Sequence, residues 1–431
     1  MRRGTLVRVL AVTVGILVAL AGAGVVAYRV LAPHESLTRP TVPYPQVAVI
    51  TDERPFSELR ATPLVVEGRL RVYAEKWRVW SDAPVGERYE QTPYWAFRRW
   101  PEQVVGVVTA QTGSGPIVVT QWSDGAVIAL DARRGEIAWR TKQPIVSGRT
   151  YDGRRTGASV VYEPRSLRTV RVGEQTVLIV TGPRVVQAID AATGRALWHR
   201  DSSADCEPTV WTGQTLVAIP DCRGPQVTFV AALDGTVRSQ WTSPDATVAP
   251  APALCELNRF ECPLVVVGAK DWELTADGKL VAVAPLEPGS ARSGDRVVYQ
   301  TATGVAARPL GGGDPLWTWV GQGKLIAADA IGVYLLTGDR TVLGLSAATG
   351  HLEVLGCASS QPNEDWRIGH VHPTGGGYLA LERITKEQAT AADAQYIYGP
   401  RPVALVELYF PTKLPVWPGK FAACSSPLKQ P

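Results

Sequence analysis

Residues 125–139 read GAVIALDARRGEIAW, and residues 184–198 read RVVQAIDAATGRALW. In both stretches an alternating apolar segment leads to an Asp, a turn with a Gly follows, and a second segment ends on a Trp. Alternation of apolar and polar residues over four to eight positions is typical of a half-buried β-strand. Each stretch therefore predicts a β-hairpin. Two further copies occur at residues 228–241 (TFVAALDGTVRSQW) and 340–354 (RTVLGLSAATGHLEV).

The turns of these hairpins contain residues suited to their geometry. The strand-ending carboxylates are predicted to accept backbone N–H groups, and the glycines to supply the positive φ that such loops need. A large aromatic side chain in the second strand is predicted to fill the space between adjacent sheets. The residues of this structural repeat are Asp131, Gly135, Trp139, Asp190, Gly194, Trp198, Asp234, Trp241 and Gly350.

An additional apolar strand precedes each hairpin, and a further short strand precedes most of these. The repeating unit is therefore predicted to be a four-stranded antiparallel meander. Weaker copies occur near residues 70–79, 279–284 and 402–409. Strand ends then fall near residues 73, 131, 190, 234, 284, 346 and 407. Spacings of about 40–60 residues are typical of propeller blades, whose sheets each pack between two neighbours. The sequence predicts an all-β fold, a β-propeller of about seven four-stranded antiparallel blades over residues 47–424, with six or eight as alternatives.

The pattern A-L-D-A-x-T-G-x-x-x-W resembles the repeat of pyrroloquinoline-quinone-type β-propellers. That family includes quinoprotein alcohol dehydrogenases and a bacterial outer-membrane assembly factor. The resemblance is good over residues 125–241, returns at residues 340–354 and is faint elsewhere. It implies the propeller fold but no single function, because this scaffold carries enzymes and non-enzymes. The chain has no adjacent Cys-Cys pair of the kind found in the dehydrogenases, and we expect no cofactor.

The N-terminus contains an uncharged apolar run at residues 9–28, preceded by Arg2, Arg3 and Arg8. About 20 such residues are enough to cross a bilayer as a helix, and the arginines favour a cytoplasmic N-terminus. We expect a cytoplasmic segment at 1–8, a transmembrane helix at 9–28 and an extracytoplasmic remainder in a single-pass membrane protein. The alternative is a signal peptide cleaved near residues 21–23. Both interpretations export most of the chain.

The segments outside the predicted propeller are short. Residues 32–46 contain several prolines and are predicted to form an extended linker, and residues 425–431 a C-terminal tail. Arg carries most of the basic charge and Asn occurs only twice, a bias typical of high-GC, in particular actinobacterial, genomes. The 44 basic and 40 acidic residues nearly balance, so we expect no nucleic-acid partner.

All six cysteines lie in the segment that is predicted to be exported. An even number in an oxidising compartment indicates disulfides, and six cysteines allow 15 pairings. Positions on either side of predicted turns favour Cys206–Cys222 and Cys255–Cys262, which leaves Cys357 with Cys424. The alternative is a metal site, but the cysteines have no zinc-ligand spacing.

Two groups of residues are candidate sites. His370 and His372 would project from one face of a strand as a weak candidate metal pair, although a strand end entering a Gly-rich loop is the simpler interpretation. Aromatic residues also gather between positions 73 and 100. Trp, Tyr and Arg are typical of interaction hot spots, and the alternative is the core of the first blade. The candidate interaction patch is Trp77, Trp80, Tyr94, Trp95 and Trp100.

No catalytic motif occurs in the sequence, so no catalytic residue is assigned. We expect a non-catalytic, membrane-anchored scaffold for protein-protein interaction or cell-envelope assembly. Its partners would be the lipid bilayer, through the N-terminal helix, and an envelope protein or cell-wall polymer. The alternative is an enzyme or sensor that binds a quinone or a sugar in the central channel of the propeller.

Overall fold

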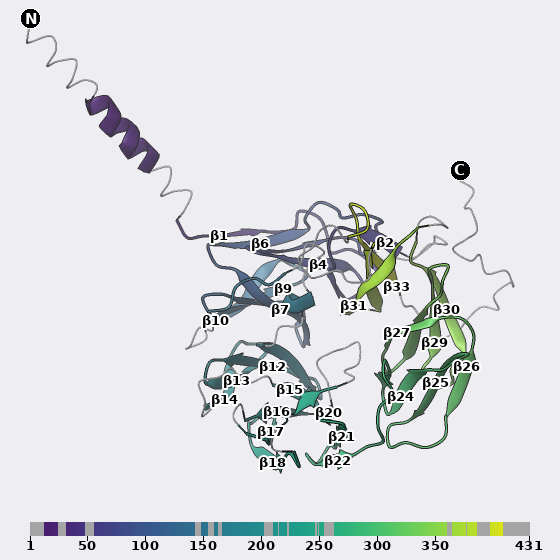
Figure 1. Cartoon of the computed structure of the whole chain (residues 1–431). Coiled ribbons are helices and arrows are strands. Elements are labelled where there is room, and N and C mark those ends of the chain that lie inside the picture. The colour runs from purple at the N-terminus through teal and green to yellow at the C-terminus, as the bar shows by residue number, and fades with distance from the viewer. Residues whose placement is uncertain are drawn as a thin grey trace, which may run out of the picture.

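The computed structural model describes residues 13–24, 32–47, 56–142, 148–153, 159–162, 166–201, 210–213, 215–221, 224–245, 248, 250–253, 263–359, 364–375, 377–385 and 397–407. Within these residues the strands form eight antiparallel sheets (Figure 1). Seven of the sheets have four strands and one has five. The prediction of an all-β propeller with four-stranded antiparallel blades is confirmed.

The first four blades follow the chain closely. Blade 1 contains β3 (Leu64–Val66), β4 (Leu70–Glu75), β5 (Arg78–Asp82) and β6 (Trp95–Trp100). Blade 2 contains β7 (Val104–Thr112), β8 (Gly115–Trp122), β9 (Ala126–Asp131) and β10 (Glu136–Lys142). Blade 3 contains β11 (Leu167–Val172), β12 (Gln175–Gly182), β13 (Val185–Asp190) and β14 (Ala196–Asp201). Blade 4 contains β15 (Trp211–Gly213), β16 (Leu216–Pro220), β17 (Gln226–Ala231) and β18 (Val237–Thr242). One short helix, α2 (Ser159–Tyr162), lies between blades 2 and 3 in the chain.

The remaining blades complete the set. Blade 5 contains β19 (Ala251–Pro252), β20 (Leu264–Val267), β21 (Lys270–Leu274) and β22 (Leu280–Ala282). Blade 6 contains β23 (Ala291–Ser293), β24 (Arg296–Gln300), β25 (Gly304–Pro309) and β26 (Trp317–Val320). Blade 7 contains β27 (Lys324–Ala328), β28 (Gly332–Leu336), β29 (Thr341–Ser346) and β30 (Leu352–Cys357). Blade 8 contains β31 (Arg367–Gly375), β32 (Tyr378–Ile384), β33 (Val403–Glu407) and β2 (Phe56–Leu59).

The prediction of seven blades is wrong, because the described strands form eight. The error lies between residues 234 and 346, where the sequence predicted one unit near residues 279–284. The structure has two sheets there, blades 5 and 6, and β22 ends at Ala282. Strands of two to six residues without the Ala-Leu-Asp turn give little periodic signal, so the sequence pattern predicts one unit where the structure has two.

Strand β2 closes the ring. It precedes blade 1 in the sequence but pairs with β33 as the outer strand of blade 8, with Phe56 opposite Val406 and Leu59 opposite Val403. The first and last parts of the folded chain are thereby joined by backbone hydrogen bonds. This pairing also explains why the last blade needs only three strands from the C-terminal part.

Strand β1 (His34–Thr38) lies in the segment that was predicted to be a linker. It pairs with β6 and becomes the fifth, outermost strand of blade 1, with His34 opposite Trp100 and Thr38 opposite Ala96. Glu35 contacts Arg99 at 3.3 Å and Arg140 of blade 2 at 2.7 Å. The segment therefore binds two blades by backbone pairing and by ion pairs.

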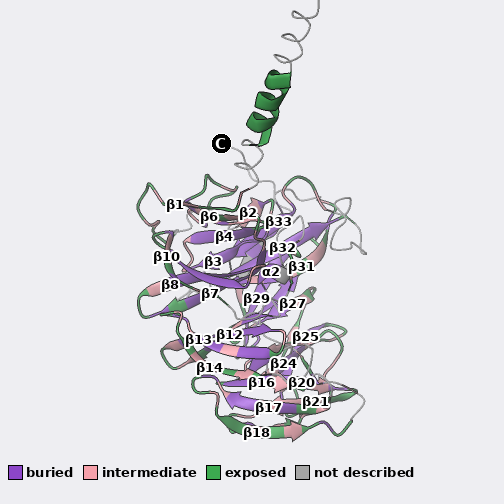
Figure 2. Ribbon diagram, turned by 90° about the vertical axis from the view of Figure 1, so that its left-hand side faces the viewer, coloured by how far each residue is buried: buried purple, intermediate pink, exposed green. Residues whose placement is uncertain are grey.

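The predicted transmembrane run at 9–28 lies only partly within the described residues. A helix is described at residues 13–24, and its side chains are exposed (Figure 2). No helix in the described ranges is long and apolar enough to cross a membrane. In both views this helix lies beyond the edge of the propeller that carries β1.

The hydrophobic core is divided into layers between sheets. One cluster joins blades 2 and 3 through Val119, Ala129, Leu178 and Ile189, all with no exposed surface. Similar clusters join blades 3 and 4, and blades 6 and 7. Each sheet thus buries its faces against neighbouring blades, as a propeller requires.

Candidate functional site: blade junctions and the outer edge of blade 1

Tryptophan side chains hold four of the blade junctions in the same way. In each, the indole N–H donates to the carbonyl oxygen of a buried alanine in the next blade. The pairs are Trp95 to Ala132 at 2.9 Å, Trp139 to Ala191 at 2.8 Å, Trp198 to Ala232 at 2.8 Å and Trp317 to Ala347 at 3.0 Å. The alanines follow the end of the third strand of their blade. Because the indole ring is mostly buried and its polar atom has a partner, each contact combines apolar packing with a hydrogen bond.

A glycine accepts the face of each of these indoles. Gly194 has φ +73°, and a Cβ atom at this position would lie 2.6 Å from the Trp139 ring. The same contact joins Gly135 to Trp95, Gly235 to Trp198 and Gly350 to Trp317, each with positive φ. The glycine is needed twice at these positions, for its backbone conformation and for the close approach of the ring.

The strand-ending aspartates organise the turns. The Asp131 carboxylate accepts the backbone N–H groups of Arg133 and Arg134 at 2.8 and 2.9 Å. Asp190 accepts those of Ala192 and Thr193, both at 2.9 Å. These two residues shape the turn that presents the alanine carbonyl to the preceding Trp.

Blade 4 departs from the predicted alignment of the repeat. Ala232 receives the Trp198 indole, so Ala231 occupies the place that Asp190 has in blade 3. Asp234 lies three residues farther along, inside the turn, where its carboxylate accepts the N–H of Thr236 at 2.9 Å. The turn has the same length as in blade 3, because Gly235 donates its N–H to the carbonyl of Ala231 as Gly194 does to that of Asp190.

Trp241 is displaced in the same way. Trp139 and Trp198 lie four residues after the turn glycine of their own blade. In blade 4 this position, counted from Gly235, is Ser239. Ser239 donates a hydrogen bond to the carbonyl of Gly278 in blade 5. Trp241 instead lies edge-on to Trp272, with ring centroids 5.5 Å apart. The junction between blades 4 and 5 is therefore built differently from the four above.

The sequence repeat did not predict the docking role of two tryptophans, Trp95 and Trp317. Trp317 lies four residues after Gly313, the same spacing as Gly135 to Trp139, and this signal could have found it. Trp95 is not preceded by such a glycine. Its role is visible only because Gly135 of the next blade receives its ring.

A buried ion pair lies within blade 1, between β4 and β5. Arg71 on β4 and Asp82 on β5 face each other with no exposed side-chain surface and form two hydrogen bonds, at 2.8 and 2.7 Å. Arg71 also donates to the carbonyl oxygens of Glu87 and Tyr89 at 2.8 and 2.9 Å. Burial raises the pKa of the Asp82 carboxyl, and the Arg71 guanidinium opposes this effect. The pair fixes the loop between β5 and β6.

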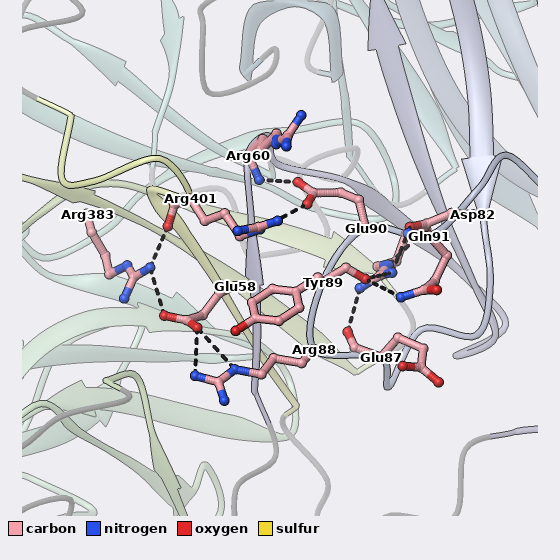
Figure 3. A network of polar contacts seen from close by, with 11 residues as sticks. Glu58, Arg60, Asp82, Glu87, Arg88, Tyr89, Glu90, Gln91, Arg383 and Arg401 are labelled. Atoms are coloured by element: carbon pink, nitrogen blue, oxygen red, sulfur yellow. Dashed lines mark hydrogen bonds and ion pairs between the residues drawn. The ribbon is translucent and has the colours of Figure 1, made fainter.

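That loop reaches blade 8 through a network of side chains (Figure 3). Glu58 on β2 accepts two hydrogen bonds from Arg88, at 3.1 and 3.0 Å, and lies 3.5 Å from Arg383 on β32. The Tyr89 ring lies between two guanidinium groups, with Arg401 4.3 Å and Arg88 5.2 Å from its centroid. The network connects β2 both to the loop between β5 and β6 and to β32, which is a structural role.

The two histidines on β31 lie close together. The rings of His370 and His372 are stacked with centroids 5.8 Å apart, His370 exposed and His372 buried. Among the described residues, no group of three or more His, Cys, Asp or Glu side chains could hold a metal ion.

The structure divides the candidate aromatic patch. Trp95 has no exposed surface and Tyr94 is 6% exposed, so both belong to the blade 1 core. Trp77, Trp80 and Trp100 are partly exposed. Trp80 stacks on Tyr73 at 4.5 Å, and Trp77 meets Trp100 edge-on at 4.8 Å. Trp100 lies on β6 opposite His34 of β1, whereas Trp80 lies on β5, one strand farther from β1.

The cysteine side chains lie outside the part of the chain that the structure describes. Five of the cysteines are not among the described residues: Cys206, Cys222, Cys255, Cys262 and Cys424. The side chain of Cys357 is not described either. Strands β15 and β16 do form a hairpin near Cys206 and Cys222, with Trp211 opposite Ala218. The three disulfide pairings stay predictions.

A segment with several arginines joins blades 2 and 3. Part of it is buried, because Val161 and Tyr162 of α2 pack into the core shared by blades 1 and 2. The Tyr162 hydroxyl accepts the N–H of Ala74 at 3.0 Å. Helix α2 therefore packs against β4.

Comparison with known proteins supports the repeat. A family model described as outer membrane protein assembly factor BamB matches residues 123–317. The resemblance to the pyrroloquinoline-quinone-like propeller repeat is thereby confirmed. The search of curated proteins found no match.

Several solved propellers are similar in fold. BamB from Moraxella catarrhalis is 14% identical, with a TM-score of 0.41, and the match covers 87% of this chain and 98% of that one. A computationally designed protein, Ika8, is 14% identical with a TM-score of 0.45, covering 82% and 99% of the two chains. The C-terminal WD40 domain of Sif2 is 13% identical with a TM-score of 0.42, covering 86% and 98%.

Proposed function

We propose that this chain, which carries the pyrroloquinoline-quinone-like propeller repeat, is a membrane-anchored extracytoplasmic scaffold without catalytic activity. It would bind an envelope protein or a cell-wall polymer and help to assemble the cell envelope. The observation that carries the proposal is the use of the repeated residues. At four junctions a Trp, a Gly and an Ala form the contact between blades, as in Trp139 with Ala191 and Gly194.

Two further observations support it. The matching family model describes an outer membrane protein assembly factor, and an assembly role is the simplest function to carry over to this chain. The apolar run at 9–28, behind three arginines, favours an anchor with the propeller outside the membrane. Strand β1 follows the apolar run closely in the sequence and pairs with blade 1, which would keep the propeller near the membrane surface.

The test has two stages. In the first, membranes that contain the full chain are washed with carbonate and then treated with protease from the outer side. We expect the protein to stay in the pellet and the propeller to be accessible to protease. Recovery of a soluble form that begins near Gly24 would show cleavage and refute the anchor.

In the second stage, intact cells are treated with a crosslinker that does not enter the cytoplasm, and adducts of the tagged chain are identified by mass spectrometry. The control is a variant with Trp139→Ala, in which the junction between blades 2 and 3 is weakened. We expect one reproducible envelope adduct with the parent chain and a reduced yield with the variant. A yield that does not depend on an intact propeller would argue against the scaffold function.

A further inference from the structure

Four side chains form a partly exposed aromatic and basic surface at one end of blade 1. Lys76 and Trp77 lie in the turn between β4 and β5, and Arg98 and Trp100 lie near the end of β6. We call these four residues the blade 1 edge. Trp77 contacts Trp100 edge-on at 4.8 Å, and the Lys76 ammonium lies 4.9 Å from the Trp77 ring centroid. The surface therefore presents two large indole rings with a cation directly beside them.

The two cations of the blade 1 edge, Lys76 and Arg98, differ from Arg78 of the same sheet in their ion pairing. Arg78 pairs with Glu75 at 2.6 Å. By contrast, neither Lys76 nor Arg98 has an ion-pair partner among the residues that the structure describes, and both are exposed. The blade 1 edge thus has a net positive charge that is available to an anionic surface.

The position of the blade 1 edge links it to the N-terminal run. His34 is the register partner of Trp100, so the chain enters the propeller beside this surface. Only residues 29–33 separate the end of the apolar run at Tyr28 from His34. At about 3.6 Å per residue even fully extended, this length holds His34 within about 22 Å of Tyr28. The first two views agree that the β1 side of the propeller is nearest to the helix (Figures 1 and 2).

Indole rings prefer the interface between lipid and water, where an apolar ring with a polar N–H finds both environments. Lys and Arg side chains near the membrane are attracted to anionic headgroups within a Debye length of the surface. Both residue types occur together at the blade 1 edge, at the one place where the short connection limits the distance to the bilayer.

We propose that the blade 1 edge lies against the anionic headgroups of the bilayer in which the N-terminal helix is anchored, and so fixes the orientation of the propeller. This inference rests on the membrane anchor of the proposed function. A protein partner is the other class of molecule that such a surface could bind, but the five-residue connection to the apolar run favours lipid.

The experiment uses the full chain in vesicles of phosphatidylglycerol and phosphatidylcholine that contain a nitroxide-labelled headgroup lipid. Quenching of tryptophan fluorescence reports which rings touch the headgroup layer. The test variant carries Trp77→Phe and Trp100→Phe, and the matched control carries Trp241→Phe in blade 4. We expect the test variant to lose most of the quenchable signal and the control to retain it.

A second variant tests the charges without removing the reporters. With Lys76→Glu and Arg98→Glu we expect the quenching in phosphatidylglycerol vesicles to fall to the level of pure phosphatidylcholine vesicles. Quenching that is the same in all variants would overturn the proposal. Quenching of Trp77 and Trp100 by aqueous iodide, but not by labelled lipid, would also overturn it and assign the surface to a soluble partner.

A carbonate wash of the same vesicles separates the two levels of the argument. If the chain is released by the wash, the anchor itself fails and the proposed function fails with it. If the chain stays in the vesicles while the quenching result is negative, the blade 1 edge fails alone and the anchored scaffold stands.

Discussion

The contact between Trp139 and Gly194 gives the sharpest test of how the blades are joined. The change is Gly194→Ala, which adds a single methyl group. Gly194 has φ +73°, and the added Cβ would lie 2.6 Å from an atom of the Trp139 ring. The substitution should therefore destabilise the protein in two ways, through the backbone and through the ring.

The two costs can be estimated separately. A left-handed conformation costs a residue with a Cβ about 1–2 kcal/mol. Displacement of a well-packed ring adds about 1–3 kcal/mol. Gly173→Ala is the matched control, because Gly173 lies in the same blade with φ +60° and has no atom within 4 Å of the added Cβ. We expect Gly173→Ala to cost only the first amount and Gly194→Ala to cost both.

The assay is urea unfolding of the full chain in detergent, followed by circular dichroism, with Trp139→Ala as a second background. Trp139→Ala alone should cost about 3–5 kcal/mol. In that background, Gly194→Ala should cost no more than Gly173→Ala, a coupling of about 1–3 kcal/mol. If Gly194→Ala and Gly173→Ala were equally destabilising in the parent chain, the docking of the indole on the turn would be refuted.

Three further outcomes are expected. Arg71→Ala should cost about 3–5 kcal/mol in urea unfolding, because it leaves a buried carboxylate without its partner; a loss below about 1 kcal/mol would contradict the buried pair. Burial opposes ionisation of Asp124, but the Arg99 guanidinium holds the pKa of this carboxyl below its usual value. Its stabilisation should be present above about pH 4 and be lost as the pH falls below that value, so Asp124→Asn should flatten the dependence of the melting temperature on pH between 5 and 3; an unchanged slope would argue against the pair. Peptide mapping without reductant should find Cys357 linked to Cys424, a bond worth about 4 kcal/mol in the chain-entropy model; free thiols at both positions would disprove it.

The sequence predicted the fold class because the repeat uses the same residues for the same structural task. An Asp, a Gly and a Trp at fixed spacing indicate a hairpin and its docking to a neighbour, and blades 2 and 3 have all three. Blades 5 and 6 lack the Ala-Leu-Asp turn, and their strands are short, so their number could not be predicted from periodicity. Asp234 is a second example. Its place inside the turn could not be predicted, because an Asp in the turn and an Asp at the strand end look alike in sequence.

The aromatic residues of blade 1 illustrate what a sequence cannot decide. In the sequence, the buried residues Tyr94 and Trp95 lie among other aromatic residues, and so do the partly exposed residues Trp77 and Trp100. Only the three-dimensional arrangement separates the buried pair from the partly exposed pair, since burial depends on strands and loops that are distant in sequence. The partner strand of β2 could not be predicted either, because its four residues carry no signal that distinguishes blade 8 from blade 1.

The closure by β2 has a consequence for the order in which the molecule folds. Phe56–Leu59 leaves the ribosome early, but more than 340 residues must follow before β33 can pair with it. At about 5–20 residues per second this takes roughly 20–70 seconds. During that interval the strand presents an unpaired edge, the kind of surface that promotes aggregation. Its length of four residues and the charge of Glu58 in its middle limit that hazard, so the segment that completes the molecule is also suited to waiting for its partner.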